Sequence, residues 1–571
     1  MAKFFIGLVT GVAVVFLSMI LLFFAALRFR EKPPTIGANS VLVLRLNGEI
    51  PEKAALQLPD FLDGDKGATT VPGIWQNLKK AAGDSNITAL VVAPEGISAG
   101  WAKLEEMRSD IEQFRKSGKP VYAYLRTPSA REYYLATAAD RIYLGPSDPL
   151  MLKGMRAELM YFKGSLDKLG VSVDVEHAGK YKDFGDMFTR TNMSPETREV
   201  IGSVVDGLYG NLVSKIAAAR KKSEADTLAT IDAGPFTATQ ALKAGLVDEL
   251  RYEDQMWGEL GSALKGGAPT KVSIEKYMKT TPVTGKSTIA LVVGDGDIVR
   301  GNPDDNGADE RSLTSYGFNK LLKRVGSDAT VKGVIVRIDS PGGEVTASDD
   351  LWREMNLLSK KKPVVISMSD VAASGGYYMA MTGDPIIAYP ETETGSIGVV
   401  FGKPNLHGLY DKVGVTKDAL QRGKHADIDS DYTPLTEDER KTLRDGIDES
   451  YHEFVTKVAT ARKRPYGEIE PVAQGRVWLG SQAKDHGLVD ELGGLDTALA
   501  AVKKKAGIAA GETVTIVTYP ERRSLFDLLL KRSSPEDVLE TKLRQVFGRV
   551  PFHAWMKGGM LRIMPEWVQV R

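Results

Sequence analysis

The sequence predicts an α/β fold built from two tandem halves that follow an N-terminal membrane helix. Short apolar runs alternate with helical stretches in each half, and the second half repeats the first at an offset of 244 residues. Alternation of this kind is typical of βαβ units around a largely parallel sheet. A long uncharged run at the start of the chain predicts the membrane helix.

The run from Phe4 to Leu27 contains 24 residues without a charge and is flanked by Lys3 and Arg28. Apolar stretches of 18 or more residues are long enough to cross a bilayer as a helix. The alternative is a cleaved signal peptide, whose apolar region is usually only about 7–15 residues. We therefore expect an uncleaved anchor and linker in residues 1–38. Positive charge is denser after the run, which favours a cytoplasmic body but leaves the orientation open.

Each half opens with apolar runs that predict buried strands. They are Val41–Leu46, Ile87–Val92 and Val121–Leu125 in the first half, and Ile289–Val293, Val334–Ile338 and Val364–Met368 in the second. Each half also contains a long helix. The first is expected to start at Ser194, a cap residue followed by proline. The second is expected to start at Thr436, where Glu439 has the capping-box spacing.

The repeat predicts a first domain over residues 39–275, a second over 276–510 and a tail over 511–571. The acidic, Gly- and Pro-rich segment Asp295–Glu310 is expected to be a mobile loop, because its ligand spacing is wrong for an EF-hand. The stretch Tyr519–Arg571 has no counterpart in the first half. Two interpretations stay open: an amphipathic tail that contacts a membrane or another subunit, or a helix that packs on its own domain.

Composition excludes several classes of function. Lys+Arg and Asp+Glu both number 74, so the formal net charge is zero. A nucleic-acid-binding protein needs a basic surface, so we expect no nucleic-acid partner. The chain has no cysteine, which excludes disulfides, thiolate catalysis and cysteine-based metal sites.

The two copies differ at two positions that carry chemistry. Ser374 aligns with Ala130, and Lys182 aligns with Ala426, both at the offset of 244 residues. A serine is thus retained in the second copy and a lysine in the first. These complementary losses predict one composite site made from Ser374 and Lys182.

A serine hydroxyl is a weak nucleophile until a base takes its proton. The base we expect is Lys182; His425, one residue before the lysine's counterpart, is the alternative. Lysine has a pKa near 10.4 in water, which must fall by roughly two to three units for it to act as a base near neutral pH. Burial at an apolar interface lowers a lysine pKa. We therefore expect Lys182 to be buried without a carboxylate in direct contact.

Glycines beside the serine predict an oxyanion hole. Gly375 follows Ser374 at the start of a helical run, where its amide can face a developing oxyanion. The segment Asp339-Ser-Pro-Gly-Gly343 ends the preceding strand, and we expect the amide of Gly343 to be the second donor. The first copy has Ala99 opposite Gly343, so it has lost this feature together with the nucleophile.

Four segments in this order resemble a known family: Gly179–Lys182, Asp339–Gly343, Ala372–Gly376 and Thr394–Gly398. The chain resembles the long, tandem form of the signal peptide peptidase A (protease IV) family over roughly residues 40–510. The resemblance implies a ClpP/crotonase-like fold in each half. It also implies a Ser-Lys dyad with Ser374 as nucleophile and Lys182 as general base. After the lysine the family often has Ser-Ala-Val, whereas this chain has Asp183-Phe-Gly.

The resemblance further implies a homotetramer anchored in the bacterial inner membrane that degrades hydrophobic peptides left from cleaved signal sequences. It places the catalytic body outside the cytoplasm, whereas the charges that flank the membrane run favour a cytoplasmic body. No metal, nucleotide or other cofactor is expected. Two alternatives stay open. One is a crotonase-like acyl-CoA enzyme that uses the same oxyanion hole without a serine nucleophile, and the other is an inactive membrane scaffold.

Overall fold

The structure is a computed structural model that describes residues 33–53, 69–264, 269–302, 312–520, 559–564 and 569–570, with a few isolated positions before residue 33. The predicted membrane run Phe4–Leu27 lies almost entirely outside the described residues. Within the described part, no helix has the length and apolar character needed to span a bilayer.

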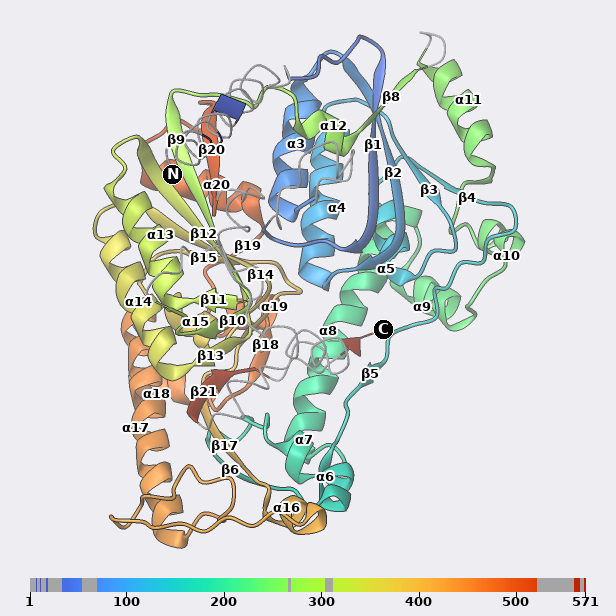
Figure 1. Cartoon of the computed structure of the whole chain (residues 1–571). Coiled ribbons are helices and arrows are strands. Elements are labelled where there is room, and N and C mark those ends of the chain that lie inside the picture. Colours follow the sequence, from blue (N-terminus) through green and yellow to red (C-terminus); the bar gives the residue numbers. More distant parts are fainter. Residues whose placement is uncertain are drawn as a thin grey trace.

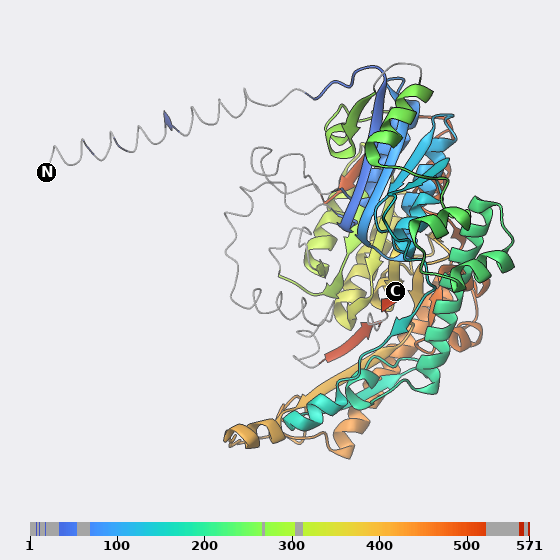
Figure 2. The same ribbon diagram turned by 90° about the vertical axis from the view of Figure 1, so that its right-hand side faces the viewer.

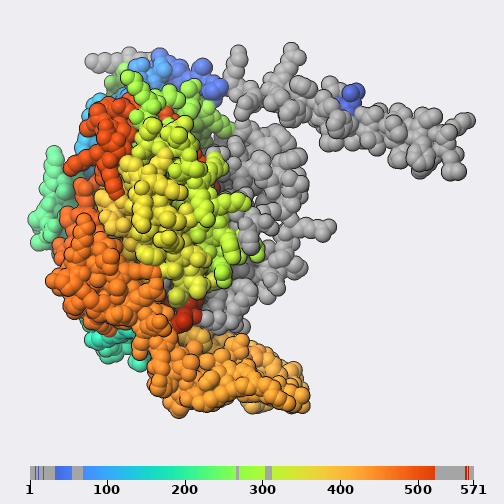
Figure 3. All heavy atoms as spheres, turned by 90° about the vertical axis from the view of Figure 1, so that its left-hand side faces the viewer, coloured from blue at the N-terminus to red at the C-terminus, as the bar shows by residue number. Residues whose placement is uncertain are grey.

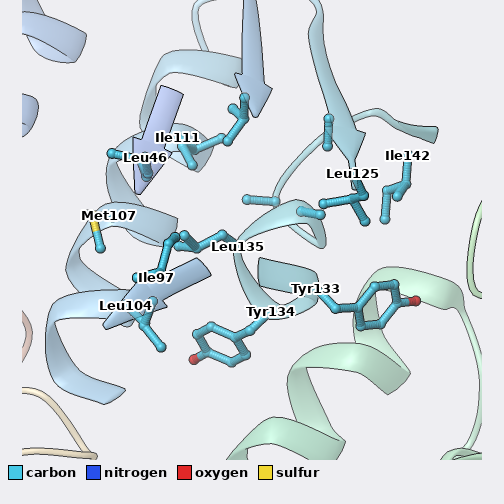
Figure 4. Packing of buried hydrophobic residues seen from close by; sticks show 14 of the residues in the cluster. Leu46, Ile97, Leu104, Met107, Ile111, Leu125, Tyr133, Tyr134, Leu135 and Ile142 are labelled. Atoms are coloured by element: carbon cyan, nitrogen blue, oxygen red, sulfur yellow. The ribbon is translucent and has the colours of Figure 1, made fainter. Parts of the chain in front are cut away.

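The first half is built on a six-stranded parallel sheet with the order β7-β4-β3-β2-β1-β8. Its strands are β1 (Ser40–Glu49), β2 (Ile87–Ser98), β3 (Val121–Leu125), β4 (Arg141–Leu144), β7 (Glu249–Leu250) and β8 (Thr270–Ser273). Alternate residues of β1 enter two cores on opposite faces, as the period of a strand requires. One face packs on α3 (Val71–Gly83), α4 (Trp101–Arg115) and α5 (Ala130–Ala136), as Figure 4 shows for residues around Leu104 and Leu135. The other packs on α11 (Glu253–Ala263).

The second half repeats this arrangement (Figure 1). The main path of its sheet is β18-β16-β14-β12-β9-β20, and β15 and β19 extend it beside β14. The strands are β9 (Ser287–Asp295), β12 (Val331–Ser340), β14 (Val364–Ala373), β15 (Ile386–Ala388), β16 (Glu393–Gly395), β18 (Val477–Leu479), β19 (Glu491–Leu492) and β20 (Val514–Tyr519). Helices α13 (Ser315–Ser327), α14 (Val345–Ser359) and α15 (Gly375–Met379) cover one face, and α20 (Leu495–Lys505) covers the other. Figure 3 shows the second half filling one side of the molecule.

The predicted mixed α/β architecture is confirmed, and all six predicted strands are present. The pairing of β20 with β9 carries the second sheet to Tyr519, beyond the expected boundary at residue 510. Both long helices start where predicted. Helix α8 (Pro195–Arg220) is capped by Ser194, and α17 (Glu437–Arg462) has the capping box of Thr436 and Glu439.

A third sheet joins the two halves, and the sequence did not predict it. Its order is β11-β10-β13-β21-β17-β6. The strands are β6 (Ser172–Ala178), β10 (Asp297–Val299), β11 (Ser312–Thr314), β13 (Gly342–Glu344), β17 (Val399–Asn405) and β21 (Gly559–Ile563). Strand β6 of the first half pairs antiparallel with β17 of the second, in the arm that extends away from the two main sheets in Figure 2.

One expectation is wrong in part where this third sheet forms. Part of the predicted loop Asp295–Glu310 is strand β10, because it pairs with β11 and β13; residues 303–311 lie outside the described part. In the tail beyond Tyr519, the described residues include strands β21 and β22 (Gln569–Val570). Residues 521–558 lie outside the described part, so both interpretations of the tail stay open. Strands β21 and β22 pair with partners far away in the sequence.

Buried charges connect the two halves. The guanidinium of Arg337, on β12, is fully buried and bonds the carboxylate of Glu52 from the first half. Lys103, on α4, forms an ion pair with Asp339, with 2.7 Å between the charged atoms. The amides of Gly100 and Lys103 donate to the carboxylate of Asp370, which precedes the end of β14. The start of α4 is therefore fixed against the two strands that lead to the predicted oxyanion glycines.

Candidate active site

Lys182 reaches the second half through the pairing of β6 with β17. Ala178 at the end of β6 lies opposite Val399, and the chain then turns through Gly179, which has φ 106°. A Cβ on Gly179 would lie 2.6 Å from the carbonyl carbon of Gln474. One on Gly475 would lie 2.6 Å from both the Cβ and the backbone nitrogen of Lys182. The lysine loop therefore packs directly on the backbone of the second half.

Ser374 occupies a strained turn between β14 and α15. Its backbone has φ 52° and ψ −114°, which is unusual for a residue with a side chain. The turn is held because the Ser374 amide donates to Gly395 O at 2.8 Å and its carbonyl accepts from Tyr378 N at 2.8 Å. Strain of this kind is commonly retained at functional sites.

The side chains of Lys182 and Ser374 meet in the interior. Lys182 Nζ lies 2.8 Å from Ser374 Oγ, 2.9 Å from Ser396 O and 3.0 Å from Ser396 Oγ. Lys182 is 1% exposed and Ser374 is fully buried. The expected burial of the lysine is therefore confirmed. The amine lies among neutral oxygen atoms at the boundary between the halves.

The carboxylate that follows the lysine in sequence has another partner. Asp183 Oδ2 accepts a hydrogen bond from Thr197 Oγ1 at 2.5 Å. Burial raises the pKa of Asp183, and the hydrogen bond from Thr197 opposes that shift. The departure from Ser-Ala-Val is thus accommodated by α8, which supplies Thr197.

The predicted oxyanion glycines come shortly after β12 and β14, two strands that pair with each other. Gly343, in β13, pairs with Ile298, and a Cβ on it would lie 1.9 Å from the carbonyl oxygen of Ile298. Gly375 is the first residue of α15. A Cβ on Gly376 would lie 2.5 Å from Ser340 O, so the start of α15 packs against the end of β12. Close backbone packing therefore holds Gly343 against β10, and holds the start of α15, which follows Ser374, against the end of β12.

Comparison with known proteins gives the family. The sequence profile of peptidase family S49 matches residues 113–265 and again residues 356–509. The chain belongs to peptidase family S49. It is 35% identical over 493 residues to "Serine protease SPPA, chloroplastic" of Arabidopsis thaliana, covering 84% of this chain and 71% of that protein. It is 33% identical over 470 residues to "Protease 4" of Salmonella typhi, covering 79% and 74%. The predicted resemblance is confirmed, and the chain is a serine peptidase of this family.

In the first half of this S49 peptidase, a buried carboxylate lies in the region equivalent to the Ser374 turn. Ala130 starts α5, and Glu132 stands where the second half has Gly376. The Glu132 carboxylate is 3% exposed and accepts from the amides of Ile97 at 2.7 Å and Ser129 at 2.8 Å. An acidic side chain thus binds amides in the region where the other copy has its nucleophile turn.

The alternative base, His425, has other neighbours in the S49 peptidase. Its Nε2 lies 3.3 Å from Asp438 Oδ2, near the start of α17. Both His425 and Ser374 are described residues, and no hydrogen bond joins them. The basic group that contacts the serine hydroxyl is Lys182.

Sequence reasoning missed Ser396, which supplies two of the lysine's contacts. Its φ of 49° turns the chain so that carbonyl and hydroxyl both reach Nζ. The sequence did contain a signal for Ser396, because this residue lies within the segment Thr394–Gly398 that carries the family resemblance. The segment alone did not reveal which atom the serine contacts.

Proposed function

We propose that this S49 peptidase hydrolyses hydrophobic peptides through an acyl-enzyme, with Ser374 as nucleophile and Lys182 as general base. The observation that carries the proposal is the 2.8 Å contact between Lys182 Nζ and Ser374 Oγ, both buried. A base within hydrogen-bond reach of a hydroxyl is the geometry that activates it. Desolvation favours the neutral amine that this role requires.

The reaction follows from these positions. Lys182 takes the proton of Ser374 as the hydroxyl attacks a peptide carbonyl. The amides of Gly343 and Gly375 stabilise the oxyanion, and one such donor is worth about 10²–10³-fold in rate. Lys182 then gives the proton to the leaving amine and activates the water that releases the acyl group. Ser396 positions Lys182 by accepting from the amine through its carbonyl.

The substrates in this proposal are hydrophobic peptides left after signal sequences are cleaved. Apolar clusters on both sides of the third sheet support this substrate class. One surrounds Phe184 and Phe188 from the first half, and the other surrounds Phe401 and Ile447 from the second. The Salmonella typhi relative named "Protease 4" supports peptidase activity in a bacterial setting.

The proposal includes a ClpP/crotonase-like fold in each half. It also includes a homotetramer anchored in the bacterial inner membrane by Phe4–Leu27, with the catalytic body outside the cytoplasm. The parallel βαβ sheets of both halves support the fold. The length of the uncharged run supports the anchor.

The test combines active-site labelling with turnover of a hydrophobic reporter peptide. A fluorophosphonate probe is expected to label the wild type at Ser374 and to leave Ser374→Ala unlabelled. Lys182→Ala is expected to lower kcat by about 10²–10⁴-fold, the usual contribution of a general base. Lys180→Ala is the matched control, because that lysine is exposed and its amine lies 3.9 Å from Glu196.

Each alternative predicts another result. Near-normal activity of Lys182→Ala, with loss in His425→Ala, would assign the base to the histidine. A crotonase-like acyl-CoA enzyme would not be labelled at Ser374. If the protein is an inactive scaffold, neither the wild type nor any variant would hydrolyse the peptide.

A further inference from the structure

Helix α4 of the first half takes its N-terminal cap from the second half. Its own N-cap residue, Gly100, has no side chain that can bond the amides at the start of the helix. Asp370, on β14, takes this role, because its carboxylate accepts from Gly100 N at 2.9 Å and from Lys103 N at 2.8 Å. A Cβ on Gly100 would lie 2.3 Å from Asp370 Cγ, so a side chain there would clash with the cap. The strand that leads to Ser374 therefore completes a helix of the other half.

Lys103 brings a buried cation to the same place. Its Nζ lies 2.7 Å from Asp339 Oδ2 and 3.7 Å from Asp370 Oδ2. Burial lowers the pKa of Lys103, but the facing carboxylates, Asp339 first, outweigh burial and raise this pKa above its ordinary value. Burial raises the pKa of Asp370, and the charge of Lys103 opposes that shift. The amine of the first half therefore stays charged between two carboxyl groups of the second.

Asp339 lies where the register of β12 and β14 changes. The two strands pair regularly as far as Ile338, and Ser340 then lies opposite Ala372 after a register shift. Within this irregular stretch, Asp339 Oδ1 accepts from Val371 N at 3.1 Å. Beyond it, the two strands lead to the proposed oxyanion donors and to the nucleophile. The Asp339 carboxylate therefore joins the two segments whose spacing determines the oxyanion hole.

The repeat shows that this contact exists only between the halves. Helix α14 is the copy of α4 at the offset of 244 residues, and its third residue is Ala347, where α4 has Lys103. The first-half positions equivalent to the two acids are Glu95, which is exposed, and Arg126. Neither half alone has both the buried lysine and its acid partners. The lysine is in the first half and the acids are in the second, the same division that the proposed dyad has.

We propose that Lys103 is a positioning residue for the reaction. Its ion pair with Asp339, together with the Asp370 cap of its helix, holds the ends of β12 and β14 at the spacing that the oxyanion hole requires. This inference rests on the proposed function. Oxyanion donors stabilise the transition state because they are already in place, so a displacement of Gly343 or Gly375 lowers the rate rather than substrate binding. The first half thus supplies the general base and also orders the strands that carry the nucleophile.

Steady-state kinetics of the full chain tests the positioning role. Lys103→Met keeps most of the length of the side chain and removes its charge. We expect kcat for a hydrophobic reporter peptide to fall at least about tenfold, and KM to change less than about twofold, because the lost interaction acts in the transition state. Labelling of Ser374 by a fluorophosphonate also uses the oxyanion hole and should slow by at least about tenfold. The control is Lys116→Met, which changes an exposed lysine directly after the same helix and should leave both rates unchanged.

A double variant separates positioning from stability. Lys103→Met alone leaves Asp339 buried without its cation, which lowers stability. Lys103→Met combined with Asp339→Asn removes both charges, and the new amide oxygen can still accept from Val371 N. Its unfolding temperature should therefore recover most of the loss seen in Lys103→Met. Its kcat should stay at least about fivefold below that of the wild type, because no bond joins the lysine position of α4 to β12.

Three results would overturn the inference: a wild-type kcat in Lys103→Met, a loss that appears in KM instead of kcat, or a double variant whose kcat recovers together with its unfolding temperature. If Lys103→Met does not fold, kcat of the double variant decides alone. Failure of the proposed function gives a different pattern. The wild type and Lys116→Met would then neither hydrolyse the peptide nor be labelled at Ser374.

Discussion

Replacing Arg337 by methionine tests the buried charges that connect the halves. The guanidinium has no exposed surface. It bonds Glu52, Ser367 and Ser369, and its Nη1 lies 3.2 Å from Glu106 Oε2. Methionine has a similar reach but carries no charge. The variant therefore leaves two carboxylates buried at the boundary without their cation.

The expected loss of stability in Arg337→Met follows from the burial of its ion pairs. Removing one partner of a buried ion pair usually costs about 3–5 kcal/mol. Burial already raises the pKa of Glu106 to about 7, and Arg337 opposes the rise. Without Arg337, Glu106 must stay protonated to remain buried. A raised carboxyl pKa lowers stability as pH increases, because the unfolded state releases the proton first. The loss in Arg337→Met should therefore be larger at pH 8 than at pH 5.5.

The assay is thermal unfolding followed by tryptophan fluorescence at both pH values. A loss of about 3–5 kcal/mol corresponds to at least about 6 °C for a domain of this size. The control is Lys441→Met, which breaks an exposed pair with Asp445 and should leave the unfolding temperature unchanged. An Arg337→Met protein that unfolds within about 2 °C of the wild type at pH 8, below the shift expected from a buried pair, would refute the reasoning.

Three further predictions concern single side chains. Gly343→Ala places a methyl group against Ile298 O and should lower kcat/KM by about 10²–10³-fold. The control Gly467→Ala has open space at its Cβ and should leave kcat/KM unchanged. An equal change of kcat/KM in both variants would contradict the oxyanion role of Gly343. Ser396→Ala removes one hydrogen bond to Lys182, worth about 1 kcal/mol, and should lower kcat about fivefold and shift its pH profile. An unshifted profile would contradict the positioning role. Burial, followed by the charge of Glu105, raises the pKa of Glu391 to about 8. Wild-type stability should therefore fall as pH rises from about 4.5 towards 8, and Glu391→Gln should raise the unfolding temperature at pH 8.5 but not at pH 4; a gain equal at both pH values would contradict this.

Local signals in the sequence predicted the local structure well. The apolar runs placed β1, β2 and β3, because buried parallel strands are nearly continuous hydrophobic segments. The starts of α8 and α17 followed from cap residues that bond their own helix. The juxtaposition of Ser374 and Lys182 was predicted from complementary losses in the repeat, and the structure brings these side chains within hydrogen-bond distance.

Other contacts between distant segments were not accessible from the sequence. The pairing of β6 with β17 depends on edges that neither half can complete alone. Strand β21 has no counterpart in the first half, so the repeat gave no guide to its position. The partners of Arg337 are likewise far away in the chain, and no motif marks Glu52 as its acceptor.

The third sheet links the segments that carry Gly343 and Lys182. One edge of β17 pairs with β6, which leads into Lys182, and the other edge pairs with β21. The far edge of β21 pairs with β13, which contains Gly343. Strand β21 therefore joins the strand that contains Gly343 to the strand that supports the lysine loop. Each half has lost one member of the Ser374–Lys182 pair. The pairing of β6 with β17 brings the remaining lysine and the remaining serine within hydrogen-bond distance.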